Sequence, residues 1–492
     1  MARLNDQRLV TVSIMLATVM QVLDTTIANV ALPHMQGSLS ASTDQITWVL
    51  TSYIVAAAIM TPTVGFMASR LGRRRLFLWS VAGFTVTSGL CGLSASLDQM
   101  VLFRILQGVF GAALVPLSQS VLLDAYPVEK HGQAMAIWGM GVMVGPILGP
   151  TLGGWLTEWY SWRWVFYINL PFGLLAFAGI WLSVSETETR KVRFDIMGFA
   201  YLGLAIGAFQ LMLDRGEQVQ WFESFEIQLE AVLALLGLYL FVVHSLTRKD
   251  PFIDPALFKD RNFVTGLVFI FVVGIILLAT MALLPPFLQQ WKDYPAVTTG
   301  LVLAPRGLGS MFSMMLVGRL MRTRLDPRVL VITGLLFITF SLHEMAGFTL
   351  EVSRNTLIWT GVLQGLGLGL VFVPASALTY ATLNPSLRTE GASLFSLSRN
   401  LGSSVGISIM TAMLSRNLWI NQQQLGEHLQ LAPWLSQGLP MKEMVGSVPA
   451  AVYQTLLSQA AEISYMNDFR LLMWINMAAI PLVFLLRHQR RA

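Results

Sequence analysis

Asp24 stands where a charged residue is rare, inside an apolar run that begins at Val10 and ends at Pro33. Such a run is long enough to cross a bilayer. A carboxylate at the centre of a membrane helix costs roughly 2.5–3.5 kcal/mol on insertion scales, so it is seldom placed there without a function. A single buried acid in the first span predicts a proton-binding site.

Arg104 is a candidate partner for this acid, because the two residues fall at nearly the same predicted depth. With the first span starting at Thr11, Asp24 lies about 20 Å from the inner surface. Arg104 lies in an antiparallel span that starts at Gln99, ~8 Å from the outer surface of a roughly 30 Å core. An acid and a base at one depth can pair and exchange protons. The alternative is an ion pair that only locks two helices together.

Other polar residues inside apolar runs either line a cavity or form hydrogen bonds between helices. Arg306 and Arg399 lie about 14 Å from the surfaces where their spans enter, so both must face the protein interior or water. The neutral polar side chains inside the spans are Gln21, Asn29, Gln107, Gln210 and Gln364. The candidate substrate-cavity residues are Gln21, Asn29, Gln107, Gln364, Arg306 and Arg399.

A glycine ladder in the fifth apolar run predicts a conformational hinge. Glycines at every fourth position form one smooth helical face, which lets two backbones approach closely. Two prolines within the ladder remove backbone donors and permit bending. A generic packing face is the alternative. The residues of this motif are Gly141, Gly145, Pro146, Gly149, Pro150, Gly153 and Gly154.

A short basic turn joins the second and third runs. It contains Gly65, Arg70, Gly72 and Arg73, and a similar turn follows Gly318 in the second half of the chain. Anchoring by positive charge on the inner side would explain the arginines alone. Recurrence at the matching place in both halves favours a gating turn.

The elements that must position these residues are membrane helices. The chain is 54% hydrophobic and only 12% charged, which indicates an all-α polytopic membrane protein. We predict fourteen spans, from runs of about 18 or more apolar residues. They cover 11–32, 48–68, 76–96, 99–123, 134–156, 164–184, 196–213, 228–246, 263–284, 297–320, 328–349, 356–380, 390–413 and 469–486.

Charge in the loops predicts the orientation. With the N-terminus placed in the cytoplasm, 22 of the 32 Lys and Arg fall in inner segments and 7 in outer ones, so both termini are expected inside. The first run is too long for a signal peptide and is interpreted as a retained span. Cys91 is the single cysteine, so no intrachain disulfide can form.

An internal repeat divides the chain. Gln107 and Gln364, and likewise Pro116 and Pro374, lie about 258 residues apart in matching contexts. The repeat matches the fourth span to the twelfth, which fits two six-span halves with two inserted spans, a 6+2+6 arrangement. The expected parts are residues 1–185, 186–262 and 263–492, the last including an extracytoplasmic segment, 414–468. Residues 450–465 of that segment could form a helix lying on the membrane surface.

Several function classes are disfavoured by the sequence. There is no Gly-x-x-x-x-Gly-Lys-Ser/Thr motif and no soluble region large enough for an ATPase. No cluster has convincing metal-ligand spacing, and no nucleophile elbow is present. We therefore expect no enzyme, no metal and no cofactor. Transport would run on an ion gradient, worth ~2.3 kcal/mol per charge per 100 mV.

Together these motifs resemble the fourteen-span drug:proton antiporters of the major facilitator superfamily, the EmrB/QacA type, and most closely its EmrB-like members. Residues 23–33 resemble the first-span motif, and residues 102–108 resemble the fourth-span motif. The resemblance implies a proton-coupling role for Asp24 and Arg104. The glycine ladder is similar to the antiporter motif, and residues 162–171 match the motif at the start of the sixth span.

The resemblance also implies a place and partners. It implies a multi-pass protein of the bacterial inner membrane, working with an EmrA-type periplasmic adaptor and an outer-membrane channel. The basic turn departs from the superfamily pattern, because Ser69 stands where an Asp is usual. That departure leaves a charge-relay lock at this turn in question.

The sequence thus predicts proton-driven efflux of lipophilic drugs by alternating access between the halves. Asp24 would be deprotonated when drug loads or leaves and protonated from outside, with Arg104 biasing its protonation. One alternative is an exporter of a narrow physiological substrate, such as a fatty acid, a siderophore or an amino acid. The other is a membrane sensor that transports nothing. The excess of mid-membrane arginines leans towards neutral or weakly acidic compounds.

Overall fold

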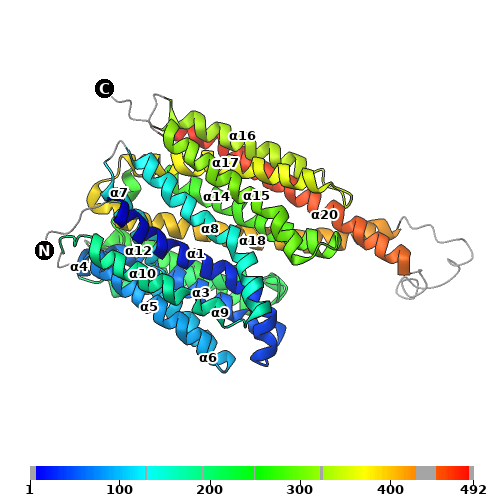
Figure 1. Ribbon diagram of the computed structural model, residues 1–492, viewed down its shortest axis with the longest axis horizontal. Helices are drawn as coiled ribbons and strands as arrows, with labels where there is room; N and C mark the ends of the chain where they lie inside the picture. Colours follow the sequence, from blue (N-terminus) through cyan, green and yellow to red (C-terminus); the bar gives the residue numbers. More distant parts are fainter. Residues whose placement is uncertain are drawn as a thin grey trace, which may run out of the picture.

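The computed structural model describes residues 7–127, 130–189, 193–248, 250–321, 325–427 and 450–486. Within these residues the chain is helical and contains no strand. Figure 1 shows long helices that run side by side in an elongated bundle. The described chain starts and finishes at the same end of the bundle, which we name the α1 end, and the opposite end is the far end.

The first half packs around α1 (Gln7–Ser38), which carries Asp24. A bend of 59° separates α3 from α4 near Thr61 and Pro62, and the pair could form one broken span. The other helices of this half are α2 (Thr43–Ile46), α3 (Trp48–Met60), α4 (Thr63–Leu71), α5 (Arg73–Leu93), α6 (Leu97–Gly111), α7 (Leu114–Ala125), α8 (His131–Trp159), α9 (Trp164–Tyr167) and α10 (Asn169–Ser183).

The second half packs around α17 (Arg354–Ala381), the most enclosed of the long helices, with 72% of its apolar window buried. The other helices of this half are α13 (Ala256–Lys259), α14 (Arg261–Pro286), the π-helical turn η3 (Phe287–Trp291), α15 (Ala296–Leu320), α16 (Pro327–Met345), α18 (Arg388–Glu427), α20 (Ala450–Ala479) and the 3-10 turn η5 (Ile480–Leu485).

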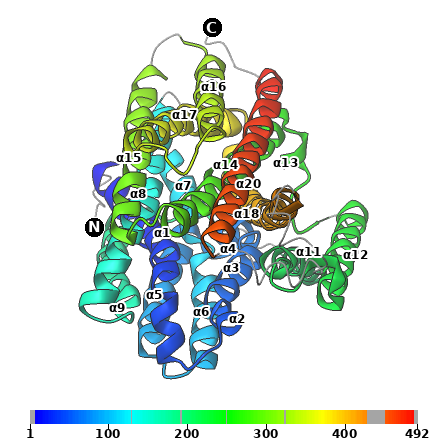
Figure 2. The same cartoon turned by 90° about the vertical axis from the view of Figure 1, so that its right-hand side faces the viewer.

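Two further helices, α11 (Ile196–Arg215) and α12 (Phe225–Thr247), lie to one side of the bundle (Figure 2). Only 11% of the apolar window of α12 is buried, so this helix forms the rim. α11 contacts both halves: Asp214 accepts a hydrogen bond from Thr51 of α3, and Gln210 Nε2 donates to Ser404 Oγ of α18 at 2.8 Å. The inserted pair therefore borders the seam between the halves.

The described residues contain twelve helices long and apolar enough to span a membrane, or thirteen with the bent pair α3–α4. The remaining predicted span, 390–413, falls within α18, which is not one of these twelve. The all-helical fold is confirmed, whereas the count of fourteen, the side of the termini and the limits of the three parts stay predictions.

The predicted surface helix is wrong, because residues 450–465 are the first part of α20 and continue without a break into the last span. Hydrogen bonds to α18 explain this: Asn421 Nδ2 donates to Ser464 Oγ at 2.9 Å, and Gln422 Nε2 to Tyr453 Oη at 3.3 Å. The pair α18–α20 extends along the far end (Figure 1). Residues 428–449 of the predicted outer segment lie outside the described residues.

Candidate functional site

Asp24 is completely buried in the first half, where α1 packs against α8, α10 and α7. The side chain of Arg104, from α6, reaches it there, and Nη1 lies 2.8 Å from Asp24 Oδ2. Both side chains are at most 1% exposed. The structure therefore brings together the acid and the base that the sequence placed at one depth.

Two amides complete the shell around the carboxylate. Gln107 Nε2 donates to Asp24 Oδ1 at 2.9 Å, and Asn169 Nδ2 donates to the same oxygen at 2.7 Å. Asn169 also lies 2.9 Å from the hydroxyl of Ser88, which donates to the Phe166 carbonyl. An ionised carboxylate with three donors can be accommodated in a dry interior, because its charge is balanced and both of its oxygens accept hydrogen bonds.

Arg104 is held from three sides. Its Nε donates to the Val49 carbonyl at 2.9 Å, and its Nη1 also contacts Gln107 Oε1 at 2.8 Å. The guanidinium carbon lies 4.3 Å from the ring centroid of Tyr53, a cation–π distance. Gln21 Nε2 in turn donates to the Tyr53 hydroxyl at 3.1 Å. Arg104 thus joins α1, α3 and α6 around one charge.

Asn169, Ser88 and Tyr53 belong to this site, and the sequence did not single them out. Each is a neutral or aromatic residue of a type that is common inside membrane helices, so type alone gives no signal. Asn169 did lie in the motif at the start of the sixth span, residues 162–171. That motif was the available hint.

The site can exchange its ion pair for a neutral acid. Protonation of Asp24 would remove the charge that holds Arg104, while the Val49 carbonyl and Gln107 would still accept its hydrogen bonds. The spacing between α1, which carries Asp24, and the helices α3 and α6, which hold Arg104, could then change. This coupling between one proton and helix packing is what a proton-driven conformational change needs.

The glycine ladder packs directly on the helix of Asp24. A Cβ added to Gly145 would lie 2.8 Å from the Val22 carbonyl oxygen, and one added to Gly153 would lie 3.2 Å from that of Ile27. Gly141 and Gly149 face the same helix. The hydroxyl of Thr26 donates to the Gly145 carbonyl at 3.1 Å. The close-packing role is therefore visible.

The hinge role of the ladder stays a prediction. Helix α8 runs unbroken from His131 to Trp159, through Pro146 and Pro150. Gly154, by contrast, has nothing within 4 Å of an added Cβ and does not share the packed face.

The six candidate substrate-cavity residues do not form one group. Gln107 belongs to the carboxylate shell, and Gln21 is attached to it through Tyr53. Asn29 is exposed. Gln364 is buried in the second half, where its Nε2 donates to the hydroxyl of Thr280 at 3.2 Å.

The two remaining candidates, Arg306 and Arg399, have no carboxylate partner among the described residues. Arg306 is 6% exposed and donates to the Leu277 carbonyl at 3.2 Å. Arg399 lies at the seam between the halves, with its guanidinium 5.9 Å from the ring of Trp138. Trp138 of α8 stacks on Phe372 of α17, so aromatic side chains fill the seam at this level.

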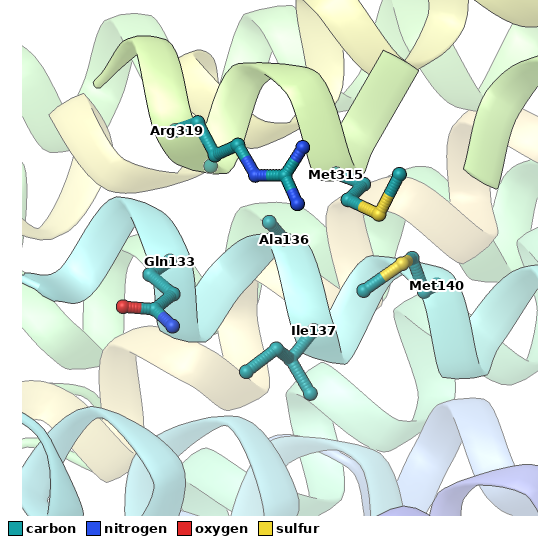
Figure 3. Close-up of a pocket in the computed structure, with 7 residues that line it drawn as sticks. Gln133, Ala136, Ile137, Met140, Met315 and Arg319 are labelled. Carbon is teal, nitrogen blue, oxygen red and sulfur yellow. The ribbon is translucent and has the colours of Figure 1, made fainter. Parts of the chain in front are cut away.

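A hollow of about 200 Å³ lies between α8 of the first half and α15 of the second. Figure 3 shows Met140 and Met315 facing one another across it, with Arg319 reaching towards Ala136. None of the six candidate cavity residues lines it. The hollow therefore lies between the two halves, and no residue of the Asp24 shell lines it.

The predicted gating turn lies at the α1 end, where it meets the second half. Gly72 takes a φ of +87°, which suits glycine, and lets α5 start directly after α4. A Cβ on Gly65 would come within 2.8 Å of the Glu390 backbone, so α4 and α18 touch there. Arg73 pairs with Asp124 of α7, whereas Arg70 is exposed.

Asp124 of α7 supplies an acid beside the turn. Its carboxylate pairs with Arg73 of the first half and, at 2.9 Å, with Arg388 of the second. The hydroxyls of Ser120 and Thr389 lie 2.9 Å apart, and the Tyr380 hydroxyl donates to Gln119 Oε1 at 3.0 Å. These contacts close the α1 end across the seam. In the second-half turn, residues 322–324 lie outside the described part of the chain.

Comparison with known proteins gives consistent findings. The family model described as Major Facilitator Superfamily matches residues 14–407. The chain is 39% identical over 422 residues to the fatty acid resistance protein FarB of Neisseria gonorrhoeae, covering 85% of this chain and 83% of that protein. It is 38% identical over 427 residues to the multidrug export protein EmrB of Escherichia coli (strain K12), covering 86% and 82%.

Solved structures share the fold. The proton:xylose symporter XylE, bound to 6-bromo-6-deoxy-D-glucose, superposes with a TM-score of 0.62 at 13% identity, covering 96% of each chain. A bacterial homologue of the human lysosomal transporter Spinster, in an inward-facing and unoccupied conformation, gives 0.56 at 18% identity, covering 99% of each. The predicted resemblance and fold class are confirmed.

Proposed function

The chain belongs to the Major Facilitator Superfamily, and from this premise we propose that it exports lipophilic drugs in exchange for protons. It is a multi-pass secondary transporter of the bacterial inner membrane and not an enzyme. Its similarity to a multidrug export protein, at 38% identity over most of both chains, supports drugs as the cargo.

One observation carries the proton part of the proposal. Asp24 is a buried carboxylate paired with the cation of Arg104, and its shell joins α1, α6 and α10. A proton that binds there changes the charge balance of the helices that must move. No cofactor is required, because the transmembrane gradient supplies ~2.3 kcal/mol per charge per 100 mV.

The cycle follows from the seam between the halves. With the α1 end closed by Asp124, Arg388 and their neighbours, the cargo would leave towards the far end. Protonation of Asp24 from that side would release Arg104 and allow the halves to rock. Loading of the next cargo from the α1 end would accompany loss of the proton.

A second candidate cargo is a fatty acid or another weakly acidic lipophilic compound. It is favoured by the buried Arg306 and the half-buried Arg399, which have no carboxylate partner among the described residues. An anionic headgroup could supply that partner. The relative FarB, named for fatty acid resistance, supports this candidate. Siderophores and amino acids remain narrower alternatives.

Partners in a wider pump are also part of the proposal. An EmrA-type periplasmic adaptor and an outer-membrane channel would take the cargo onward. The pair α18–α20 offers a site for the adaptor, because both helices continue along the far end.

Replacing Asp24 with Asn tests the proposal directly. Asn has the size of Asp and two polar atoms at the end of its side chain, but it cannot bind and release a proton. We expect Asp24→Asn protein to insert and fold, and to lose gradient-driven drug efflux in proteoliposomes by at least 100-fold.

Equilibrium binding of drug to the purified variant serves as the control for folding. Asp98→Asn, at the exposed start of α6, should transport like the original chain. If Asp24→Asn protein still concentrated drug against a gradient, the coupling role of Asp24 would be excluded. A separate test, competition for efflux between unrelated drugs and a fatty acid, distinguishes a broad range of substrates from a narrow one.

A further inference from the structure

Asp468 is a second carboxylate buried inside the helical bundle, in the half opposite to Asp24. It lies on α20 and is 1% exposed. α20 packs against α18, α16 and α14, so protein surrounds the residue on several sides. It was not among the residues that the sequence singled out, because it falls just before the predicted last span.

The surroundings of Asp468 differ sharply from those of Asp24. Its Oδ1 accepts one hydrogen bond, from Asn417 Nδ2 of α18 at a long 3.3 Å. Its Oδ2 is buried and has no hydrogen-bond partner among the described residues. Asp24, in contrast, has an arginine and two amides. The negative charge of Asp24 is balanced by a cation, whereas a negative charge on Asp468 would not be.

Among the described residues, no charged group forms a hydrogen bond or an ion pair with Asp468. Arg416 of α18 and Arg470 of α20, close to it in sequence, have exposed side chains. His343 and Glu344, at the end of α16, are also exposed. Lys292, which follows η3, donates to two backbone carbonyls, and Glu462 of α20 accepts from the Leu350 amide. Tyr465, whose ring packs on Phe287, is a further titratable group nearby, whereas Arg261, the charged residue of α14, is the first residue of that helix.

Burial without a cation favours the neutral acid, because ionisation would leave an uncompensated charge in a poorly polarisable interior. In the neutral acid, the carbonyl oxygen accepts from Asn417, and the other oxygen carries the proton instead of a charge. We infer that Asp468 is a second proton-binding site of this transporter, which holds its proton in the conformation closed at the α1 end.

The same helix that touches Asp468 also closes the seam. α18 contains Arg388 and Thr389, which contact the first half, and Asn417, which donates to Asp468. Opening the α1 end must move the start of α18. Because α18 is one continuous helix, the environment of Asp468 changes in the same movement, and this is when its proton would be released.

The two carboxylates lie in opposite halves, Asp24 on α1 and Asp468 on α20. Two proton-binding sites, one in each half, would allow two protons to be exchanged in each cycle. This stoichiometry rests on the proposed function, whereas the protonation of Asp468 does not.

Infrared difference spectroscopy tests the protonation directly. We expect purified protein at neutral pH to show a carboxylic-acid carbonyl band that is lost in Asp468→Asn and kept in Asp98→Asn. Asn417→Leu retains the acid and removes its hydrogen bond, so the same band should move to higher frequency. An unchanged band in both Asp468→Asn and Asn417→Leu protein would overturn the inference.

Counting protons separates this inference from the proposed function. Across a series of imposed pH gradients at constant membrane potential, accumulation of a neutral drug in proteoliposomes should rise as the square of the proton ratio for the original chain. For Asp468→Asn it should rise in direct proportion to that ratio. Proton-independent drug transport would refute the proposed function and leave the infrared result standing. A square dependence that persists in Asp468→Asn would refute the second coupled proton.

Discussion

At the scale of single residues, the central question is whether Asp24 carries a proton or only holds Arg104 in place. The geometry serves both roles, because the contact is short, buried and joined by two amides. A buried ion pair is weak evidence for stability, since desolvation offsets much of the attraction. Transport and stability must therefore be measured on the same variants.

The double variant Asp24→Asn with Arg104→Gln separates these roles. Arg104→Gln alone leaves an ionised Asp24 without its cation, and breaking a buried pair in this way costs about 3–5 kcal/mol. The double variant has two neutral amides that can bond to each other, so thermal unfolding in detergent should show most of that loss recovered. We expect its gradient-driven efflux to remain absent.

A structural pair would behave differently. If the double variant regained uphill efflux together with its stability, Asp24 would be a helix lock and the proton would have to bind elsewhere. Gln107 offers a control: Gln107→Leu should weaken the shell without removing the acid, and should slow efflux without abolishing it.

Two residues of this site could be predicted from the sequence because they are charged. Asp24 and Arg104 are rare residues in apolar runs, and a count of residues along two antiparallel spans placed them at one depth. Asn169 and Ser88 give no such signal, because their types are common in spans and only the packing of α5 on α10 brings them near. Asp468 was missed because it precedes the predicted span.

At the scale of elements, the contact of α8 with α1 determines how Asp24 is held. Gly145 allows the two backbones to touch at Val22, and Thr26 bonds across the same contact. A side chain there would push the Asp24 helix away from its neighbours. The ladder thus controls the position of the carboxylate through backbone distance.

Alanine at Gly145 tests this control. The new Cβ would lie 2.8 Å from the Val22 carbonyl oxygen, which belongs to the backbone and cannot rotate away. We expect a loss of about 1–3 kcal/mol in thermal unfolding and a fall in efflux. Gly154→Ala is the matched control on the same helix, where the added Cβ meets open space and should change stability by under about 1 kcal/mol. Equal effects at both positions would contradict the packing role.

The helices themselves were largely predictable, because an apolar run long enough to cross a bilayer satisfies its backbone groups there only as a helix. What failed was the exact extent of two of them. α18 continues to Glu427 through a polar stretch, and α20 starts at Ala450. Their polar faces bond to each other through Asn421 and Ser464, a tertiary contact that hydropathy does not register.

At the scale of the whole molecule, the structure represents one of the states that a rocking transporter must visit. The α1 end is closed across the seam by an ion pair and two hydrogen bonds. The sequence could not predict which state is adopted, because the same residues must support two packings of similar free energy.

Crosslinking the seam tests whether rocking is required. The hydroxyl oxygens of Ser120 and Thr389 are 2.9 Å apart, so cysteines at these positions bring two sulfur atoms close to bonding distance. In a Cys91→Ser background, we expect oxidation of the Ser120→Cys and Thr389→Cys pair to block efflux, and a reductant to restore it.

Each single cysteine variant, treated with the same oxidant, serves as the control and should keep its efflux. Full efflux by the oxidised double variant, with the disulfide verified by electrophoresis after proteolysis, would show that the α1 end need not open. The proposed cycle would then fail at this step.

The unbroken length of α18 has a mechanical consequence. Its 40 residues make a rod of about 60 Å, roughly twice the thickness of the hydrocarbon layer. One end of α18 takes part in the contacts that close the seam, and the other end lies beside α20 at the far end of the bundle. If α18 rotates as a rigid rod about a point near its middle, each opening or closing of the seam moves its other end in the opposite direction. A protein bound to that end of α18 would therefore move once in each transport cycle without contacting the cargo.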